Sequence, residues 1–387
     1  MKTITAKIFK GDAVIWGVIA MLSIFSILAV YSSTGTLAFK YQGGNTLYYL
    51  LRHGFLLLIG FAIIFITHKI PVIIYLKISQ ILLFISIPLL VWTLIRGTNL
   101  NEASRWLTIP GIGLSFQTSD LAKFSLIIFI ARFLAKNQGH IKDFKTGFRS
   151  IIIWIIIVCG LILPANFSTA IMLFFTSLIL LFLGRVKIQY LLYVIGIGIA
   201  GVAIFVIIAI NLPEQKQGRV GTWKKRIENY FSGKSEENFQ VEQSKIAIAS
   251  GGFIGKGPGN SIQRNFLPHP YSDFIFAIIV EEYGVAGAFI LIALYLVLLF
   301  RAGTIVRKST SAFAAFLSMG LVISLIFQAF INMAVAVNLF PVTGQTLPLV
   351  SMGGTSIIFT CAAFGIILSI SQNVIKKPEY ERIKAES

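Results

Sequence analysis

Residues 273–300 read DFIFAIIVEEYGVAGAFILIALYLVLLF, a run of 28 residues of which only three are charged at neutral pH. A helix needs about 20 mostly apolar residues to cross the hydrocarbon core of a bilayer, so this run predicts a membrane-spanning helix. Nine further stretches meet the same criterion, at 14–31, 48–67, 72–95, 119–135, 149–164, 168–184, 188–211, 311–332 and 355–375. The sequence therefore predicts an all-α, polytopic integral membrane protein with about ten transmembrane helices.

The composition of the chain supports the same class. Of 387 residues, 56% are apolar and 12% are charged, whereas soluble domains have about 45–50% apolar and about 25% charged residues. Soluble globular, disordered, collagenous and coiled-coil proteins are thereby excluded. The two cysteines and four scattered histidines provide neither a disulfide framework nor metal-ligand spacing.

The net charge of +18 would suggest a nucleic-acid partner in a soluble protein, but in a membrane protein it indicates basic cytoplasmic loops. If the N-terminus is cytoplasmic, 19 of the 33 Lys and Arg residues face the cytoplasm, five lie in short outer segments and nine lie in residues 212–272. Long loops translocate largely regardless of charge. We therefore expect one domain over 1–387, with cytoplasmic tails 1–12 and 376–387, a long extracytoplasmic loop 212–272, and no nucleic-acid partner.

The long loop interleaves apolar side chains with its cations and its five glutamates. Examples are Trp223, Ile227, Tyr230 and Phe231. The pattern is typical of an amphipathic segment on the outer membrane face. A solvated loop is the alternative.

Ionisable groups in or near membrane spans are costly and are functional hypotheses by default. Asp273 opens one span directly after the long loop, so we expect it at the outer mouth of a polar cavity. Its alternative role is that of a helix N-cap, which Asp often fills. Glu281 and Glu282 lie deeper in the same span, and a structural role bonded to neighbouring helices is the favoured interpretation for them.

Asp120 and Lys123 are three residues apart, so they share one helical face and can pair. The pair could be structural only. Alternatively, Lys123 and Arg105 could together hold a phosphate or pyrophosphate group at the outer face.

Two glycine-containing segments need another explanation than nucleotide binding. The run Gly251–Gly259 lacks the spacing of a phosphate loop, so turns that approach other backbone closely are the better interpretation, and no nucleotide cofactor is expected. The turn-rich segment PVTGQTLPLVSMGG (341–354) must be covered by protein or line a cavity.

Several motifs, in this order, resemble the SEDS family (shape, elongation, division and sporulation proteins: FtsW, RodA and SpoVE) over essentially the whole chain. The matching stretches are Ser104–Leu107, Gln117–Lys123, Gln243–Ala247, Ser272–Ala277 with Glu281 and Glu282, and Asn332 with Pro341–Gly354. The spacing Gly257-x-Gly259-x-Ser261-x-Gln263 is similar to division-type rather than elongation-type members.

The chain departs from the family pattern at a few positions. Tyr271-Ser272 replace a usual His-Thr, and Asp120 replaces a usual Glu in a Pro-Ser-Glu motif. Asn166 stands where Asp is common, which puts an ionised role there in doubt. Asn338 replaces a usual Gly and Met352 a usual Tyr.

The resemblance implies a peptidoglycan glycosyltransferase that polymerises lipid II at the outer face of the cytoplasmic (inner) membrane, at the division septum. The implied partners are lipid II, a class B penicillin-binding transpeptidase and divisome membrane proteins. The alternatives are a flippase of the lipid-linked precursor, an elongation-type polymerase and a non-catalytic scaffold.

The resemblance also implies roles for individual residues. Asp273 would be the catalytic base, or the ligand of a divalent cation such as Mg²⁺ or Mn²⁺. Arg105 and Lys123 would stabilise the pyrophosphate, and Asp120 would orient Lys123. Further residues implied in substrate binding are Gln117, Lys245 and Ser351.

Overall fold

The computed structural model describes residues 10–96, 98–100, 103–108, 115–211 and 236–386. Among these, side chains are left out at 96, 98–100, 103–106, 108, 115, 202–211, 236–238 and 375–386. The loop residues Trp223, Ile227, Tyr230 and Phe231, for which an amphipathic segment is predicted, lie outside the described part.

All ten stretches predicted to span the membrane are helical. They correspond to α2 (Ala13–Ser33), α4 (Thr46–Lys69), α5 (Val72–Arg96), α6 (Thr118–Lys136), α7 (Arg149–Ile162), α8 (Phe167–Leu183), α9 (Ile188–Asn211), α12 (Ile275–Lys308), α13 (Ala312–Ala336) and α14 (Gly354–Glu386). The prediction of a helical, polytopic membrane protein is therefore confirmed.

Length and composition support most of the ten predicted spans directly. Within the described residues, seven helices are long and apolar enough to cross a membrane on their own. Helix α8 and the part of α9 from Ile188 to Gly201 are shorter apolar helices. Helix α6 is continuous, but it contains the charged residues Asp120, Lys123 and Arg132, which lower its mean hydropathy.

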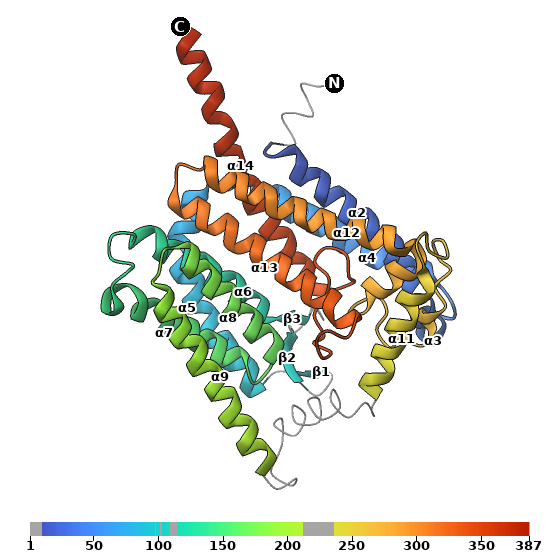
Figure 1. Cartoon of the computed structure of the whole chain (residues 1–387). Helices are drawn as coiled ribbons and strands as arrows, with labels where there is room; N and C mark the ends of the chain where they lie inside the picture. Colours follow the sequence, from blue (N-terminus) through green and yellow to red (C-terminus); the bar gives the residue numbers. More distant parts are fainter. Residues whose placement is uncertain (1–9, 97, 101–102, 109–114, 212–235, 387) are drawn as a thin grey trace.

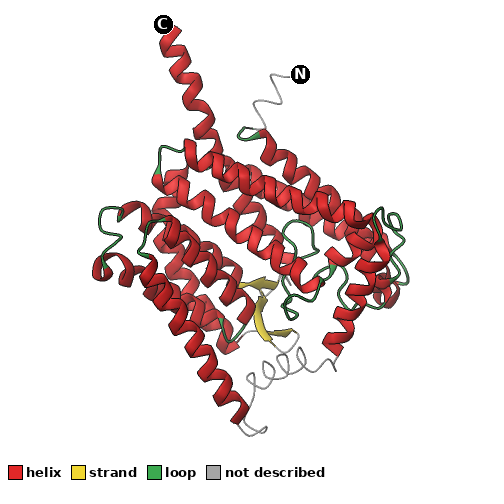
Figure 2. Cartoon of the chain, in the orientation of Figure 1, coloured by secondary structure: helices red, strands yellow, loops and turns green. Residues whose placement is uncertain are grey.

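A small antiparallel sheet of three strands accompanies the helices and was not predicted from the sequence. It consists of β1 (Thr98–Leu100), β2 (Ala103–Thr108) and β3 (Ser115–Gln117), in the order β1-β2-β3, and Figure 2 shows it below the centre of the molecule. These strands are too short to show a periodic pattern in the sequence. Pairing between the strands gives hydrogen-bond partners to backbone groups in the segment between α5 and α6.

The remaining elements are short helices: α3 (Gly35–Gln42), the π-turn η1 (Phe144–Phe148), α11 (Glu236–Gly251) and the 3₁₀ turn η3 (Gln263–Asn265). Helix α11 and η3 lie within residues 212–272.

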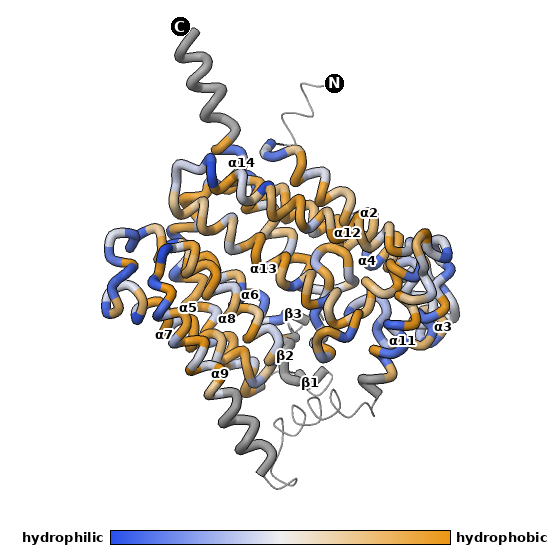
Figure 3. Tube along the Cα trace, viewed as in Figure 1, coloured by the Kyte–Doolittle hydropathy of each residue, from blue (hydrophilic) through white to orange (hydrophobic). Residues whose placement is uncertain are grey.

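The helices form a bundle around α13, which packs against α6, α8 and α12, while α4 packs on α14 and α2 on α12 (Figure 1). The start of α2 and the C-terminal end of α14 lie on the same side of this bundle. Figure 3 shows apolar residues along the helices and hydrophilic residues gathered in connecting loops.

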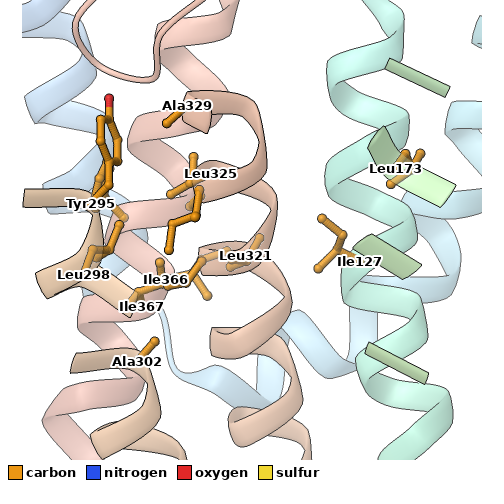
Figure 4. Packing of buried hydrophobic residues seen from close by; sticks show 14 of the residues in the cluster. Ile127, Leu173, Tyr295, Leu298, Ala302, Leu321, Leu325, Ala329, Ile366 and Ile367 are labelled. Atoms are coloured by element: carbon orange, nitrogen blue, oxygen red, sulfur yellow. The ribbon is translucent and has the colours of Figure 1, made fainter. Parts of the chain in front are cut away.

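The core is continuous across the bundle. Ile127 of α6 and Leu173 of α8 face Leu321 and Leu325 of α13, and these in turn lie next to side chains of α12 and α14 (Figure 4). In this core the Tyr295 hydroxyl donates a hydrogen bond to the Pro348 carbonyl at 2.7 Å. This hydrogen bond attaches the turn-rich segment 341–354 to α12. Both cysteines, Cys159 and Cys361, are buried thiols.

Asp12 joins three helices at the end where α2 begins. Its carboxylate caps α2 by accepting the Val14 N–H at 2.9 Å, and it forms an ion pair with Arg301 of α12, whose Nε donates at 2.9 Å. The Asp12 N–H donates to Ser371 of α14, also at 2.9 Å.

Helix α12 is broken at Gly284, where φ is 65° and ψ is −167°. The N–H groups after the break donate outside the helix, Val285 to Gly252 O at 3.0 Å and Ala286 to Phe253 O at 3.2 Å. The carbonyls of Glu281 and Glu282 instead accept from Lys256 at 3.0 Å and Gly257 at 2.9 Å. The glycine-rich run thus replaces two missing helical hydrogen bonds with four bonds between segments.

Close approach explains the glycines in this run. A Cβ at Gly251 would lie 2.1 Å from Val280 O, and one at Gly255 would lie 2.2 Å from Glu282 O. Gly255 also has a φ of +91°, which L side chains rarely adopt. The interpretation as turns that approach other backbone is confirmed.

Candidate functional site

The turn 271–273, directly before α12, is held by three consecutive backbone carbonyls. All three accept hydrogen bonds from the end of α13 or from the segment that follows it. The donors are Met352 N–H to Tyr271 O at 2.9 Å, Ser351 O–H to Ser272 O at 2.6 Å and Asn332 Nδ2–H to Asp273 O at 2.9 Å. The backbone position of Asp273 is therefore fixed by a distant part of the chain.

The carboxyl group of Asp273 does not cap α12. The helix begins at Ile275 with Phe274 at the N-cap, and no side chain makes the capping hydrogen bond. Instead Asp273 Oδ1 accepts the Ser272 O–H at 2.9 Å. The alternative interpretation of Asp273 as an N-cap is therefore wrong.

Tyr271 lies close to this carboxylate. Burial of the phenol raises the pKa of Tyr271, and the negative charge of Asp273 raises it further. Its Oη lies 3.2 Å from His269 Nδ1.

Lys123, on the first turns of α6, lies in a buried polar setting. Its Nζ is 3.5 Å from Asp120 Oδ1 and donates a hydrogen bond to Gln328 Oε1 at 2.9 Å. The Lys123 and Asp120 side chains are only 12% and 8% exposed. The predicted pairing of these two residues is present.

Gln328 and Asn332 connect Lys123 to the turn of Asp273. The Gln328 Nε2 donates to Thr346 O at 2.9 Å, and the Asn332 Nδ2 donates to Gln345 O at 2.7 Å as well as to Asp273 O. The Lys123 side chain and the backbone of Asp273 are therefore both attached to one stretch of α13.

The hydrogen-bonded group formed by Lys123, Gln328, Asn332 and the turn 271–273 extends to α8. The Gln345 side chain donates to Thr169 Oγ1 at 2.8 Å, and Asn166 caps α8 by accepting the Thr169 N–H at 3.2 Å. A neutral amide is sufficient for such a cap, which explains why Asn serves at position 166.

The backbone at Asn338 has a φ of 64°. Gly adopts this conformation freely and Asn tolerates it, which explains why Asn can replace the Gly that the family usually has at this position.

The other residues implied in substrate binding are placed differently. Ser351 is buried and uses its hydroxyl twice, accepting the Leu347 N–H at 2.7 Å and donating to Ser272 O. Gln117 ends β3 and its amide donates to Ser119 Oγ at 2.9 Å. Lys245 is exposed on α11 and takes no part in the hydrogen-bonded group described above. Arg105 lies in β2, and its side chain is outside the described part.

Four residues of the group were not predicted as site residues: Gln328, Asn332, Gln345 and Thr169. Gln328 could have been found, because it and Asn332 are polar residues four positions apart in the otherwise apolar run 311–332. The role of Thr169 depends on tertiary contacts that the sequence does not show.

Glu281 and Glu282 hold the loop that follows α11. The Glu281 carboxylate accepts from Lys256 Nζ at 2.7 Å and from the N–H groups of Ile262 and Gln263 at 3.1 and 3.2 Å. Glu282 accepts the Ser32 hydroxyl of α2 and the Ser261 N–H. These bonds tie the loop to α12 and α2.

Within the described residues, no group of three or more His, Cys, Asp and Glu side chains gathers to hold a metal ion. A Mg²⁺ ion at Asp273 would take one protein carboxylate and draw its other ligands from water and substrate phosphates, a common arrangement for this ion.

Comparison with known proteins gives matches over nearly the whole chain. Residues 12–376 match the FtsW/RodA/SpoVE family, described as cell cycle protein. A probable peptidoglycan glycosyltransferase FtsW from Trichlorobacter lovleyi is 31% identical over 380 residues, covering 96% of each chain. The protein of the same name from Coxiella burnetii is 31% identical over 364 residues, covering 92% of this chain and 95% of its own.

Two solved structures share the fold. A chain from a peptidoglycan synthase complex that coordinates polymerization and crosslinking superposes with a TM-score of 0.71 at 22% identity, covering 95% of this chain and 99% of that one. The rod shape determining protein RodA of Thermus thermophilus gives a TM-score of 0.68 at 22% identity, covering 94% and 97%.

Proposed function

The chain belongs to the FtsW/RodA/SpoVE family of cell cycle proteins, and we propose that it is a peptidoglycan glycosyltransferase of the division type. Its substrate would be lipid II, which it would polymerise into glycan strands. The name shared by its relatives supports the activity and the division role.

Asp273 is the catalytic base in this proposal. As the sugar hydroxyl of one substrate attacks the anomeric carbon of the other, its proton passes to the Asp273 carboxylate. The new β-1,4 bond forms while the bond between the anomeric carbon and the pyrophosphate oxygen breaks, and the pyrophosphate leaves with the electron pair. The reaction draws its energy from the lipid-linked pyrophosphate and needs no nucleotide.

Lys123 and Arg105 stabilise the charge that develops on the leaving pyrophosphate. Asp120 orients Lys123 from within the same helix. A divalent cation, if bound at Asp273, would supply further neutralisation of the pyrophosphate charge.

The reaction takes place at the outer face of the cytoplasmic membrane, with both termini in the cytoplasm. The start of α2 and the C-terminal end of α14 lie on the same side of the bundle, which supports the placement of both termini on one side of the membrane. The similarity to a peptidoglycan synthase complex supports a penicillin-binding transpeptidase of class B as a partner, together with divisome membrane proteins.

The observation that carries the proposal is the fixed turn 271–273, because a general base must be held within reach of the proton that it removes. The test is polymerisation of lipid II by the purified protein with its transpeptidase partner, comparing the wild type with Asp273→Asn. Loss of polymer with unchanged partner binding is expected. Polymer at the wild-type rate would overturn the assignment of Asp273.

A parallel assay of lipid II translocation in vesicles addresses the flippase alternative. Translocation by the wild type without polymer formation would favour a flippase. Normal growth of cells that carry only Asp273→Asn would favour a scaffold.

A further inference from the structure

We propose that Gln328 and Asn332 are positioning residues that together set the separation between Lys123 and Asp273. The inference rests on the proposed function, because it assumes that these two groups act on the same substrate. It concerns two side chains that touch neither the acceptor hydroxyl nor the pyrophosphate in that proposal.

The two amides occupy matching places on α13. Residues four apart in a helix lie on the same face, one above the other, separated by about 6 Å along the axis. Gln328 is 2% exposed and Asn332 is 1% exposed. Both are thus fixed inside the bundle rather than free to reorient in water.

Each amide bonds one group of the site and one carbonyl of a shared backbone segment. Gln328 accepts from Lys123 Nζ and donates to Thr346 O, while Asn332 donates both to Asp273 O and to Gln345 O. Because Gln345 and Thr346 are consecutive, the same short segment fixes both amides. The bridge therefore runs from Lys123 to Asp273 through one helical turn.

Asn332 is also not satisfied as a purely structural residue. Its Oδ1 is buried and has no hydrogen-bond partner among the described residues, and a buried unpaired acceptor costs free energy. Local costs of this kind concentrate at functional sites. An apolar residue would suit the surrounding core better, so the two donated hydrogen bonds explain why an amide stands here.

The consequence can be measured as a separation of kinetic constants. Loss of the Asn332 donor releases the backbone of Asp273 but leaves Lys123 bonded to Gln328 and Asp120. A displacement of about 1 Å at a catalytic group can cost roughly 100-fold in rate. We therefore expect kcat to fall about 10- to 100-fold, with KM for lipid II unchanged.

The experiment compares Asn332→Ala with Asn332→Ser in the full-length protein with its transpeptidase partner. The two variants leave nearly equal space, but Ser keeps one hydroxyl donor. Asn332→Ser should recover part of the lost kcat. The matched control is Ser318→Ala on the same helix, whose buried hydroxyl has no partner in the described structure, and which should keep wild-type kcat and KM.

Gln328→Leu tests the other half of the bridge. It removes the bond between Gln328 and Lys123 and leaves Lys123 with Asp120 alone, while the bonds from Asn332 to Asp273 O and Gln345 O remain. The main effect should therefore be a higher KM for lipid II.

The inference is overturned if Asn332→Ala polymerises at the wild-type rate, or if Ser and Ala at 332 give the same low kcat. It is also overturned if KM rises with the fall in kcat for Asn332→Ala. Failure of the proposed function appears separately, as wild-type polymerisation by Asp273→Asn. Melting temperatures identify a variant that fails to fold, and Asn332→Ser then provides the test.

Discussion

The main-chain oxygen of Asp273 accepts a hydrogen bond from Asn332 Nδ2 at 2.9 Å, while the carboxylate of the same residue lies outside this bond. The backbone and the side chain of Asp273 therefore have separate tasks. The backbone attaches the turn to α13, and the side chain has the proposed role in catalysis. Substitutions can address the two tasks one at a time.

Asp273→Asn should remove the base while preserving the backbone bonds of the turn, because those bonds use carbonyl oxygens. Polymerisation should fall by about 10²- to 10⁴-fold, the usual contribution of a general base. Lipid II polymerisation and thermal unfolding of the same preparation provide the measurements. A drop in melting temperature as large as that of a core substitution would contradict the division of tasks.

Lys123→Met should destabilise the protein as well as inactivate it, because it leaves Asp120 buried without its cation. Breaking a buried ion pair in this way costs about 3–5 kcal/mol. The double variant Asp120→Asn/Lys123→Met removes the remaining charge and should recover much of the melting temperature. It should recover no polymerisation, and recovery of both together would show that Lys123 is structural only.

Gly255→Ala should destabilise the loop after α11. The φ of +91° costs an L residue about 1–2 kcal/mol, and the new methyl group would overlap Glu282 O. Gly259 is the matched control, because its φ is +80° but nothing lies within 4 Å of its Cβ position. Gly259→Ala should therefore lower the melting temperature less than Gly255→Ala. Equal decreases would show that strain alone, and not the close approach, determines the effect.

Asp12→Ala and Asp12→Asn separate a helix cap from an ion pair. Asn keeps an acceptor for the Val14 N–H but loses the charge that faces Arg301. Loss of the cap alone costs about 1 kcal/mol, so Asp12→Ala should have the lower melting temperature of the two. If the two variants unfold at the same temperature, the cap contributes nothing measurable to stability.

The helical architecture could be predicted from the sequence because each apolar run is long and continuous. The strands β1, β2 and β3 could not, because three to six residues are too few to show a period of two. The break at Gly284 was also missed, since a single glycine in an apolar run is compatible with an unbroken helix. Only the backbone of residues 252–257 shows why a glycine is needed there.

The candidate site was predictable where charge stands in an apolar surrounding. Asp273, Asp120 and Lys123 were singled out on that basis, and the predicted pairing of Asp120 with Lys123 is present. The sequence did not show that Ser351 supports the turn 271–273 through its hydroxyl. It also did not show the amide bridge, because Gln328 and Asn332 acquire their meaning from residues 345 and 346, which lie elsewhere in the chain.

The break in α12 has a consequence for how the chain enters the membrane. The part after the break, residues 285–308, has 24 residues and is long enough to insert by itself. The part before it cannot complete its backbone pairing until residues 252–257, on the far side of the preceding loop, have arrived beside it. We therefore expect insertion of this span and assembly of the part of α12 before the break to be separate events, with the turn that carries Asp273 taking its final place in the second.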